Sequence, residues 1–431
     1  MSDTHAASVP YVRETMLPQV EPPSTATGPV KWVHQSLFSS IPYTILTLVA
    51  LYVIFVILSG LLPWLLGGVW NTGNIRECRE VLDGAQGGCF SVLTERWNQL
   101  LFGIAYPQDG YWRPTLAFIL LFVAAAPVLF GAVPRQLLIV TVLYPFLAFW
   151  LIWGGSLLVP LAALFSFAIG YVVYSSLVKS SFAGGLFAGI VVGVVVWFVA
   201  GFITSNLTNV LALEEVASRN MGGFMLNMIL GVICVSLSLP LGIVLALGRQ
   251  SNLPIIRLIC VVFIEFIRGV PLITLLFVAN VVLAYFLPPG TNFDLILRVI
   301  IMITMFASAY IAEVIRGGLA ALPRGQYEAA DSLGLDYAQA MRLIILPQAL
   351  KISIPGIVNV AVGLFKDTTL VSIISMFDLV GMIRGPILAS TDWNGVYWEL
   401  WGFAALLFFV VCYGISQYSQ WLERQLQTDH H

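Results

Sequence analysis

One apolar stretch of this 431-residue chain is interrupted by a cation, an anion and two hydroxyls in succession. The four residues are Lys366, Asp367, Thr368 and Thr369. At 1.5 Å per helical residue they stand ~22 Å along a predicted span that begins at residue 352, about two-thirds of the way across. Together with backbone groups freed at a helix break, they could bind the carboxylate and ammonium groups of a small zwitterion. The alternative is an internal Lys–Asp pair that locks the helix. Asn359, seven residues earlier on a similar helix face, is a further candidate.

Two acid–arginine pairs lie in other apolar runs, Glu265 with Arg268 and Glu313 with Arg316. Residues three apart share a helix face, so each pair can neutralise itself across one turn. Ionisable groups in hydrocarbon are costly unless they are paired or face a water-lined path. Glu265 and Arg268 are therefore candidates both for contact with a passing solute and for a structural lock. For Glu313 and Arg316, near the end of their run, the lock is the favoured interpretation.

A long polar interruption at 317–350 carries a fixed pattern of residues. Glu-Ala-Ala is followed by three residues and a glycine, and then by nine residues and Ile-x-Leu-Pro: Glu328, Ala329, Ala330, Gly334, Ile344, Leu346 and Pro347. We expect the first three to start a short helix with an acid in its first turn, and Gly334 to end it in left-handed geometry. Pro347 should close the loop before the next span, at Lys351. A short helix with a small-residue face could seat in a groove of a partner, whereas the alternative is an ordinary loop.

This spacing resembles the signature loop of permease subunits of ATP-binding-cassette (ABC) importers. The segments Glu265–Ile273, Tyr310–Gly318 and Leu364–Ser372 resemble polar amino-acid permeases, and the likeness covers most of 224–424. Five further spans before them resemble the long permeases of general L-amino-acid and glutamate/glutamine/aspartate/asparagine importers. Thr369 departs from the family pattern, where serine is more usual, but it keeps the hydroxyl.

The resemblance implies a transport subunit that works by alternating access rather than an enzyme. In this family the Glu-Ala-Ala helix docks on the ATPase subunit, which implies that Glu328 to Pro347 form the ATPase interface. The implied partners are two ATPase subunits that bind ATP and Mg, a second related permease in a heterodimer, and a periplasmic amino-acid-binding protein. No cofactor is expected in this chain, because none of its lysines follows a glycine as a phosphate-binding loop requires.

Two other classes of membrane protein compete with this interpretation. An ion-coupled secondary transporter or channel would need no docking loop, so the loop pattern argues against it. A membrane-embedded enzyme would need a constellation of reactive side chains at depth. All four histidines lie near the termini, at His5, His34, His430 and His431, which excludes a buried histidine relay or metal set.

The composition places the chain in a lipid bilayer. Hydrophobic residues make up 59% of it and charged residues 10%, against about 25% charged in soluble domains, and the mean hydropathy is +0.92. A net charge of -2 provides no basic field for nucleic acid. We therefore predict an all-α integral membrane protein, and the resemblance implies a type I ABC-importer permease core with an N-terminal five-helix extension.

Spans need about 20 apolar residues each. Ten runs meet this length: 41–64, 114–133, 137–157, 159–178, 184–204, 224–247, 258–286, 294–315, 352–376 and 398–418. The region 137–178 could be one span or two, but a single helix would be ~63 Å long, and Gly154, Gly155 and Pro160 offer a break. The predicted organisation is a disordered tail at 1–38, the extension at 39–220, and the core at 221–424 with its coupling loop at 317–350.

Lys and Arg in short loops put both termini on the cytoplasmic side of a bacterial inner membrane. The loop 65–113 is then periplasmic, although its four arginines count against that placement. In this oxidising compartment we expect a disulfide between Cys78 and Cys89, the alternative being two free thiols. Cys234, Cys260 and Cys412 lie in apolar runs and are expected to be packing residues.

Overall fold

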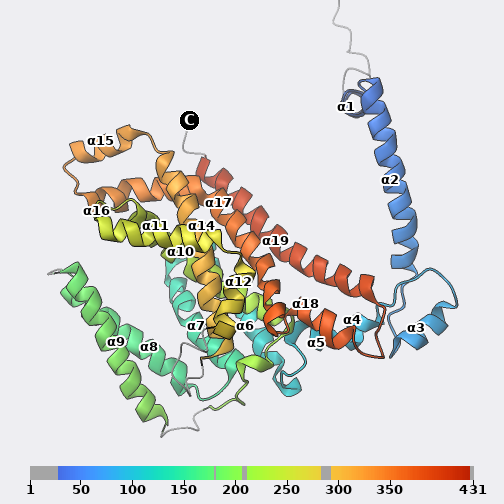
Figure 1. Cartoon of the computed structure of the whole chain (residues 1–431), viewed down its shortest axis with the longest axis horizontal. Helices are drawn as coiled ribbons and strands as arrows, with labels where there is room; N and C mark the ends of the chain where they lie inside the picture. Colours follow the sequence, from blue (N-terminus) through green and yellow to red (C-terminus); the bar gives the residue numbers. More distant parts are fainter. Residues whose placement is uncertain (1–27, 179–180, 206–210, 283–292, 428–431) are drawn as a thin grey trace, which may run out of the picture. The chain divides into compact units, whose positions relative to one another are not determined.

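The computed structural model describes residues 28–178, 181–205, 211–282 and 293–427, and in these ranges the chain forms helices and isolated bridges but no β-strand. The chain divides into two units (Figure 1). The first comprises the residues up to Gly68 together with Gly84–Gly88. The second comprises Val69–Asp83 and everything from Cys89 onward, so it holds both the rest of the predicted extension and the predicted core.

The first unit contains α1 (Gly28–Leu37) and α2 (Ile41–Leu66). Helix α2 has no buried residue, and it is apolar on every side over 26 residues, or ~39 Å. A helix of this kind is typical of a membrane span. Helix α1 lies in the part of the chain that we expected to be disordered; Pro29 suits the first turn of a helix, and the residues after it contain no further proline before Ile41.

The extension continues in the second unit with three short helices and four long ones. They are α3 (Ile75–Leu82), α4 (Ser91–Glu95), α5 (Trp97–Phe102), α6 (Trp112–Leu129), α7 (Leu138–Trp153), α8 (Leu158–Leu177) and α9 (Phe182–Ser205). The region 137–178 forms two helices, as predicted. They separate at Gly154 and Gly155, whose φ angles of 77° and 79° are open to glycine at little cost. A Cβ on Gly154 would also lie 2.9 Å from the carbonyl carbon of Glu214.

The core is made of long helices with short ones between them. They are α10 (Gly223–Arg249), α11 (Pro254–Gly269), α12 (Leu272–Phe277), α14 (Leu295–Ala320), α15 (Arg324–Ser332), α16 (Tyr337–Ala340), α17 (Leu346–Asp367), α18 (Leu379–Met382) and α19 (Tyr397–Gln427). Two spans differ from the predicted ones. The described part of the run 258–286, up to residue 282, contains a pair of helices, α11 and α12, bent by 102° around Pro271, and residues 283–286 lie outside the described residues. The run 352–376 is the end of a helical stretch that already begins at Tyr337.

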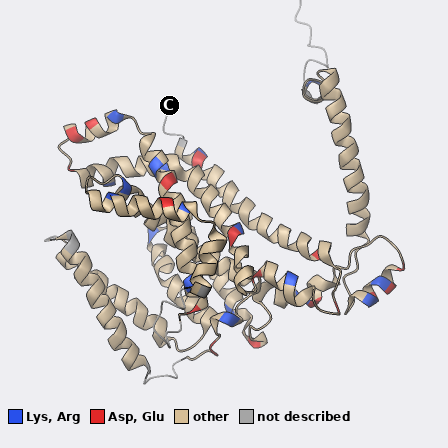
Figure 2. Ribbon diagram, viewed as in Figure 1, with Lys and Arg blue, Asp and Glu red and all other residues tan. Residues whose placement is uncertain are grey.

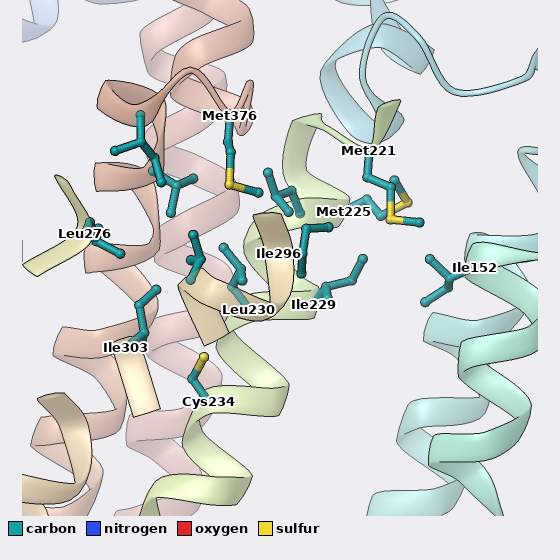
Figure 3. Packing of buried hydrophobic residues seen from close by; sticks show 14 of the residues in the cluster. Ile152, Met221, Met225, Ile229, Leu230, Cys234, Leu276, Ile296, Ile303 and Met376 are labelled. Atoms are coloured by element: carbon teal, nitrogen blue, oxygen red, sulfur yellow. The ribbon is translucent and has the colours of Figure 1, made fainter. Parts of the chain in front are cut away.

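By length and composition, nine described helices could each cross a membrane, and the bent pair α11–α12 makes a tenth. The number therefore agrees with the ten spans expected from hydropathy. A buried apolar cluster joins several of them, with side chains contributed by α7, α10, α12 and α14 (Figure 3). Cys234 and Cys260 are buried free cysteines, consistent with a packing role, and Cys412 is partly buried.

Cys78 and Cys89 are joined by a disulfide, with their Cα atoms 6.0 Å apart. Both cysteines are buried in a second apolar cluster, which also contains Leu379, Ile383 and Trp393 of the core. The backbone N–H of Cys89 donates to the buried Glu399 carboxylate at the start of α19, at 2.8 Å. We call residues 69–83 and 89–102 the disulfide cap; it is packed on the segment between α17 and α19.

We expect unreduced protein, digested after alkylation, to yield one cross-linked peptide containing Cys78 and Cys89 by mass spectrometry. Replacing both by alanine should lower the free energy of unfolding by roughly 3 kcal/mol, because a closed loop of this length restricts the unfolded chain. Cys412→Ala is the control and should leave stability within about 0.5 kcal/mol. Recovery of both thiols alkylated would contradict the bond and the periplasmic placement of the loop.

Candidate coupling helix and transport pathway

The helix that carries Glu-Ala-Ala is α15, and it begins one turn earlier than predicted. Pro323 occupies its N-cap with φ −59° and ψ 140°, so helical geometry starts at Arg324. Proline fixes φ near −65°, which suits the entry to a helix. Glu328, Ala329 and Ala330 therefore lie in the middle of α15, and the expectation that Glu328 occupies its first turn was wrong.

Gly334 ends the helix in the left-handed conformation, with φ of 69°, as predicted. Its N–H donates to Asp331 O at 2.9 Å, and the N–H of Leu335 donates to Ala330 O at 3.3 Å. These two bonds form a Schellman motif, which satisfies carbonyls left free at the helix end. No atom lies within 4 Å of a Cβ built on Gly334, so only the backbone conformation requires glycine there.

The two faces of α15 have different surroundings. Ala330 is fully buried and Tyr327 is half-buried against the apolar cluster at the ends of α14 and α17. Glu328 and Ala329 are exposed. Leu333 and Tyr337, which follow directly, are 72% and 66% exposed. The helix thus keeps one apolar contact with its own chain and presents a small, partly apolar surface outward.

The second part of the loop pattern packs inward instead. Ile344 and Leu346 are half-buried against the cluster that contains Ile345 and Ala349, whereas Pro347 is exposed. Pro347 does not end the loop, because one π-helical turn leads directly into α17, where proline is tolerated in the first turn. Ile344 and Leu346 therefore anchor the loop to this apolar cluster.

Helix α15 is attached to a tightly packed pair of spans. A Cβ on Gly318 of α14 would lie 2.5 Å from Ala349 O, and Ser353 of α17 donates to Val314 O at 3.3 Å. Gln348 Nε2 also donates to Gln326 Oε1 of α15 at 2.9 Å. Close backbone approach through small residues is typical of packed membrane helices. Displacement of α15 would therefore be carried by α14 and α17 together.

The segment Lys366–Thr369 lies where α17 changes into a 3-10 helix at Thr368. Thr368 is fully buried; its hydroxyl donates to Phe365 O at 2.7 Å and accepts from Asn227 Nδ2 at 2.9 Å. Lys366 is exposed, and Asp367 and Thr369 are half-buried. The predicted site is therefore divided: Thr368 is used in packing, and the other three side chains remain accessible. Asn359 is exposed two turns earlier on α17.

Asn227 and Asp378 form a buried polar network with Thr368 that the sequence analysis missed. Asn227 Nδ2 also donates to Asp378 Oδ2 at 3.1 Å, and its Oδ1 accepts from the N–H of Leu379 at 3.1 Å. The Asp378 carboxylate caps α18 by accepting from the N–H groups of Gly381 and Val380. Burial raises the pKa of Asp378 to about 6, although these hydrogen bonds oppose the rise. An aspartate before a helical segment was the only local signal.

The two predicted acid–arginine pairs have different outcomes. Arg316 pairs with Glu313, as expected, with its Nε donating to Oε1 at 2.7 Å. Glu265 does not pair with Arg268: it lies 2.9 Å from Nη1 of Arg249, and Arg268 lies 3.7 Å from Glu313. The self-neutralised pair on α11 was therefore wrong, because two neighbouring helices offer closer partners. Figure 2 shows charged segments together where α10, α11 and α14 meet.

Two known proteins are similar to this chain along all or nearly all of its length. The family described as the inner membrane component of binding-protein-dependent transport systems matches residues 238–426. The glutamate/glutamine/aspartate/asparagine permease protein BztC of Rhodobacter capsulatus is 51% identical over 100% of both chains. The inner-membrane amino-acid ABC transporter permease YhdY of Escherichia coli is 36% identical over 92% of this chain and 93% of its own. A probable glutamine ABC transporter permease, GlnP of Bacillus subtilis, is 32% identical over 47% of this chain and 90% of its own.

These two matches cover the extension as well as the core. They therefore assign the whole chain, and not only its second half, to a family. The chain belongs to the polar amino-acid family of ABC-importer permease subunits.

Proposed function

We propose that this permease subunit carries polar L-amino acids into the cell, with glutamate, glutamine, aspartate and asparagine as the first substrates to test. The substrate class is supported by the name of the relative that is 51% identical over the full length. The observation that carries the mechanism is the construction of α15, an exposed helix attached to two spans at once. Such a helix can transmit rigid-body motion from an ATPase to the pathway.

The proposed ATPase contact is the outward surface of α15 and the residues after it: Glu328, Ala329, Leu333, Gly334 and Tyr337. Large apolar side chains exposed to this extent beside a small-residue helix are typical of a partner surface. Ile344, Leu346 and Pro347 would support this contact from behind. Two ATPase subunits would bind ATP and Mg, and this chain would hold neither.

The proposed assembly also contains a second, related permease subunit and a periplasmic amino-acid-binding protein, in a bacterial inner membrane. With the N-terminus in the cytoplasm, ten alternating spans would put α15 and the C-terminus in the cytoplasm and the disulfide cap in the periplasm. The predicted disulfide supports this orientation, because such bonds persist in oxidising compartments.

The proposed pathway contacts are Lys366, Asp367 and Thr369, with Asn359 on the same helix. A cation and an anion at a change of helix type can bind the two charged groups of an amino acid. Thr368 takes a different role, since its hydroxyl is already hydrogen-bonded on both sides. It would hold the segment in place rather than contact the substrate.

The first test concerns transmission from the ATPase. Gly334→Val forces a β-branched residue into left-handed geometry, at a cost of about 1–2 kcal/mol, and should displace the end of α15. We expect ATP-driven uptake in proteoliposomes to fall at least about tenfold, the factor that 1.4 kcal/mol represents. Glu328→Arg, which reverses a charge on the exposed face, should reduce uptake similarly.

The matched control for this test is Gly325→Val. Gly325 also lies in α15 with open space around its Cβ, but it has no left-handed φ. We expect near-normal uptake in Gly325→Val, and equal membrane insertion for all three variants. Uptake at the wild-type rate in both Gly334→Val and Glu328→Arg would sink the proposed coupling.

The second test separates substrate contact from packing in the Lys366–Thr369 segment. Asp367→Asn and Lys366→Ala should lower the maximal uptake rate several-fold with normal assembly, because each removes one charge offered to the zwitterion. Thr368→Val leaves one of the two side-chain N–H groups of the buried Asn227 without an acceptor, at a cost of about 1–3 kcal/mol. That variant should reduce the yield of assembled complex instead. If Asp367→Asn also prevents assembly, the Lys–Asp lock is the correct interpretation.

A further inference from the structure

Five charged residues form one connected cluster on three helices, which we call the inner charge cluster. Arg249 ends α10, Glu265 and Arg268 lie near the end of α11, and Glu313 and Arg316 lie on α14. Arg249 Nη1 lies 2.9 Å from Glu265 and 3.1 Å from Glu313. Glu313 also forms ion pairs with Arg268 and Arg316, so it pairs with an arginine of each helix.

The charges in this cluster do not balance. Three arginines pair with two glutamates, which leaves one positive charge in excess. Arginine stays protonated at every physiological pH, so the excess persists. The described ion pairs bring no further acid to these five residues.

Arg268 is the arginine whose donors are least used. Its closest carboxylate oxygen lies 3.7 Å away, on Glu313, and its Nε is buried without a hydrogen-bond partner among the described residues. Its guanidinium carbon lies over the Tyr310 ring, 5.5 Å from the ring centre. A guanidinium has five N–H donors in a fork that matches a carboxylate, so Arg268 can accept one more anion.

The ion pairs of the cluster do not involve the exposed apolar face of α11. That helix exposes a stripe of apolar side chains at helical spacing: Ile255, Leu258, Ile259, Val262 and Phe266. The two charged side chains of α11 pair instead with residues of α10 and α14. The side chains of the cluster are 20–54% exposed. Glu313 lies seven residues, ~10 Å, inside the end of α14. Partly exposed charges at such a depth face water or protein rather than hydrocarbon.

We propose that the inner charge cluster is an anion-selecting site, at which Arg268 binds the side-chain carboxylate of a transported acidic amino acid. The inference rests on the proposed amino-acid transport and specifies which substrate charge the transporter prefers. An acidic amino acid has a net charge of −1, whereas its amide is neutral, so one excess positive charge distinguishes them. Across a distance of about 10 Å, with an effective dielectric constant of about 20, one unit charge on the protein changes the binding equilibrium of a singly charged substrate by roughly tenfold before salt screening.

The test is a charge series in the complete transporter, reconstituted with its binding protein and ATP. Arg268→Gln brings the cluster to neutrality, and Glu265→Gln adds one positive charge. The measurement is the ratio of the maximal uptake rates of glutamate and glutamine at saturating concentrations. We expect Arg268→Gln to lower this ratio about three- to tenfold and Glu265→Gln to raise it. A ratio cancels differences in expression and folding between variants.

The matched control is Arg257→Gln, which removes an exposed arginine of α11 that belongs to no described ion pair. Its ratio should stay within about twofold of the wild-type ratio. An unchanged ratio in Arg268→Gln, or equal changes in Arg268→Gln and Arg257→Gln, would overturn the proposal.

An anionic lipid headgroup offers the same oxygen chemistry as the substrate carboxylate. The series is therefore repeated in vesicles of phosphatidylcholine alone and with phosphatidylglycerol. The same ratios in both compositions support the substrate, whereas an effect of Arg268→Gln that needs phosphatidylglycerol overturns the assignment. A wild-type complex that transports neither amino acid would instead refute the proposed function, which keeps the two failures apart.

Discussion

An ionised side chain is costly wherever it faces hydrocarbon, and this constraint organises the core of the permease. Glu313 lies in an apolar helix and is tolerated because arginines of α10, α11 and α14 all pair with it. The same pairs hold α11 against the other two helices. Moving α11 away would separate Glu265 from Arg249 and leave its charge uncompensated, so we expect the three helices to move together.

A continuous mechanical connection runs from α15 toward the opposite end of the core. Helix α17 begins beside α15 and continues unbroken for 22 residues, or ~33 Å, to Asp367. Beyond it, Thr368 is bonded to Asn227 of α10, which is bonded in turn to Asp378 before α18. The disulfide cap packs on α18 through Leu379. A rotation of α17 would thus reach the Lys366–Thr369 segment and the cap together.

The extension contributes packing to the same unit as the core. Trp153 of α7 donates its indole N–H to Ser218, just before α10, at 3.0 Å, and Ile152 lies in the central cluster. Farther out, α8 and α9 approach closely where Gly170 and Gly189 face one another's backbones. Small residues at helix contacts replace the hydrophobic effect, which is weak between helices surrounded by lipid. In this chain α7 therefore braces the core.

The sequence by itself determined what depends on neighbouring residues: the apolar helices, the break at Gly154 and Gly155, and the left-handed end of α15 at Gly334. Hydropathy, helix length and glycine geometry act over a few residues, so they can be inferred without a fold. Only the tertiary structure decided the partners of Glu265, the burial of Thr368 and the network of Asn227 with Asp378. Asn227 and Asp378 are 151 residues apart, and their partnership depends on how the helices pack, which no local pattern encodes.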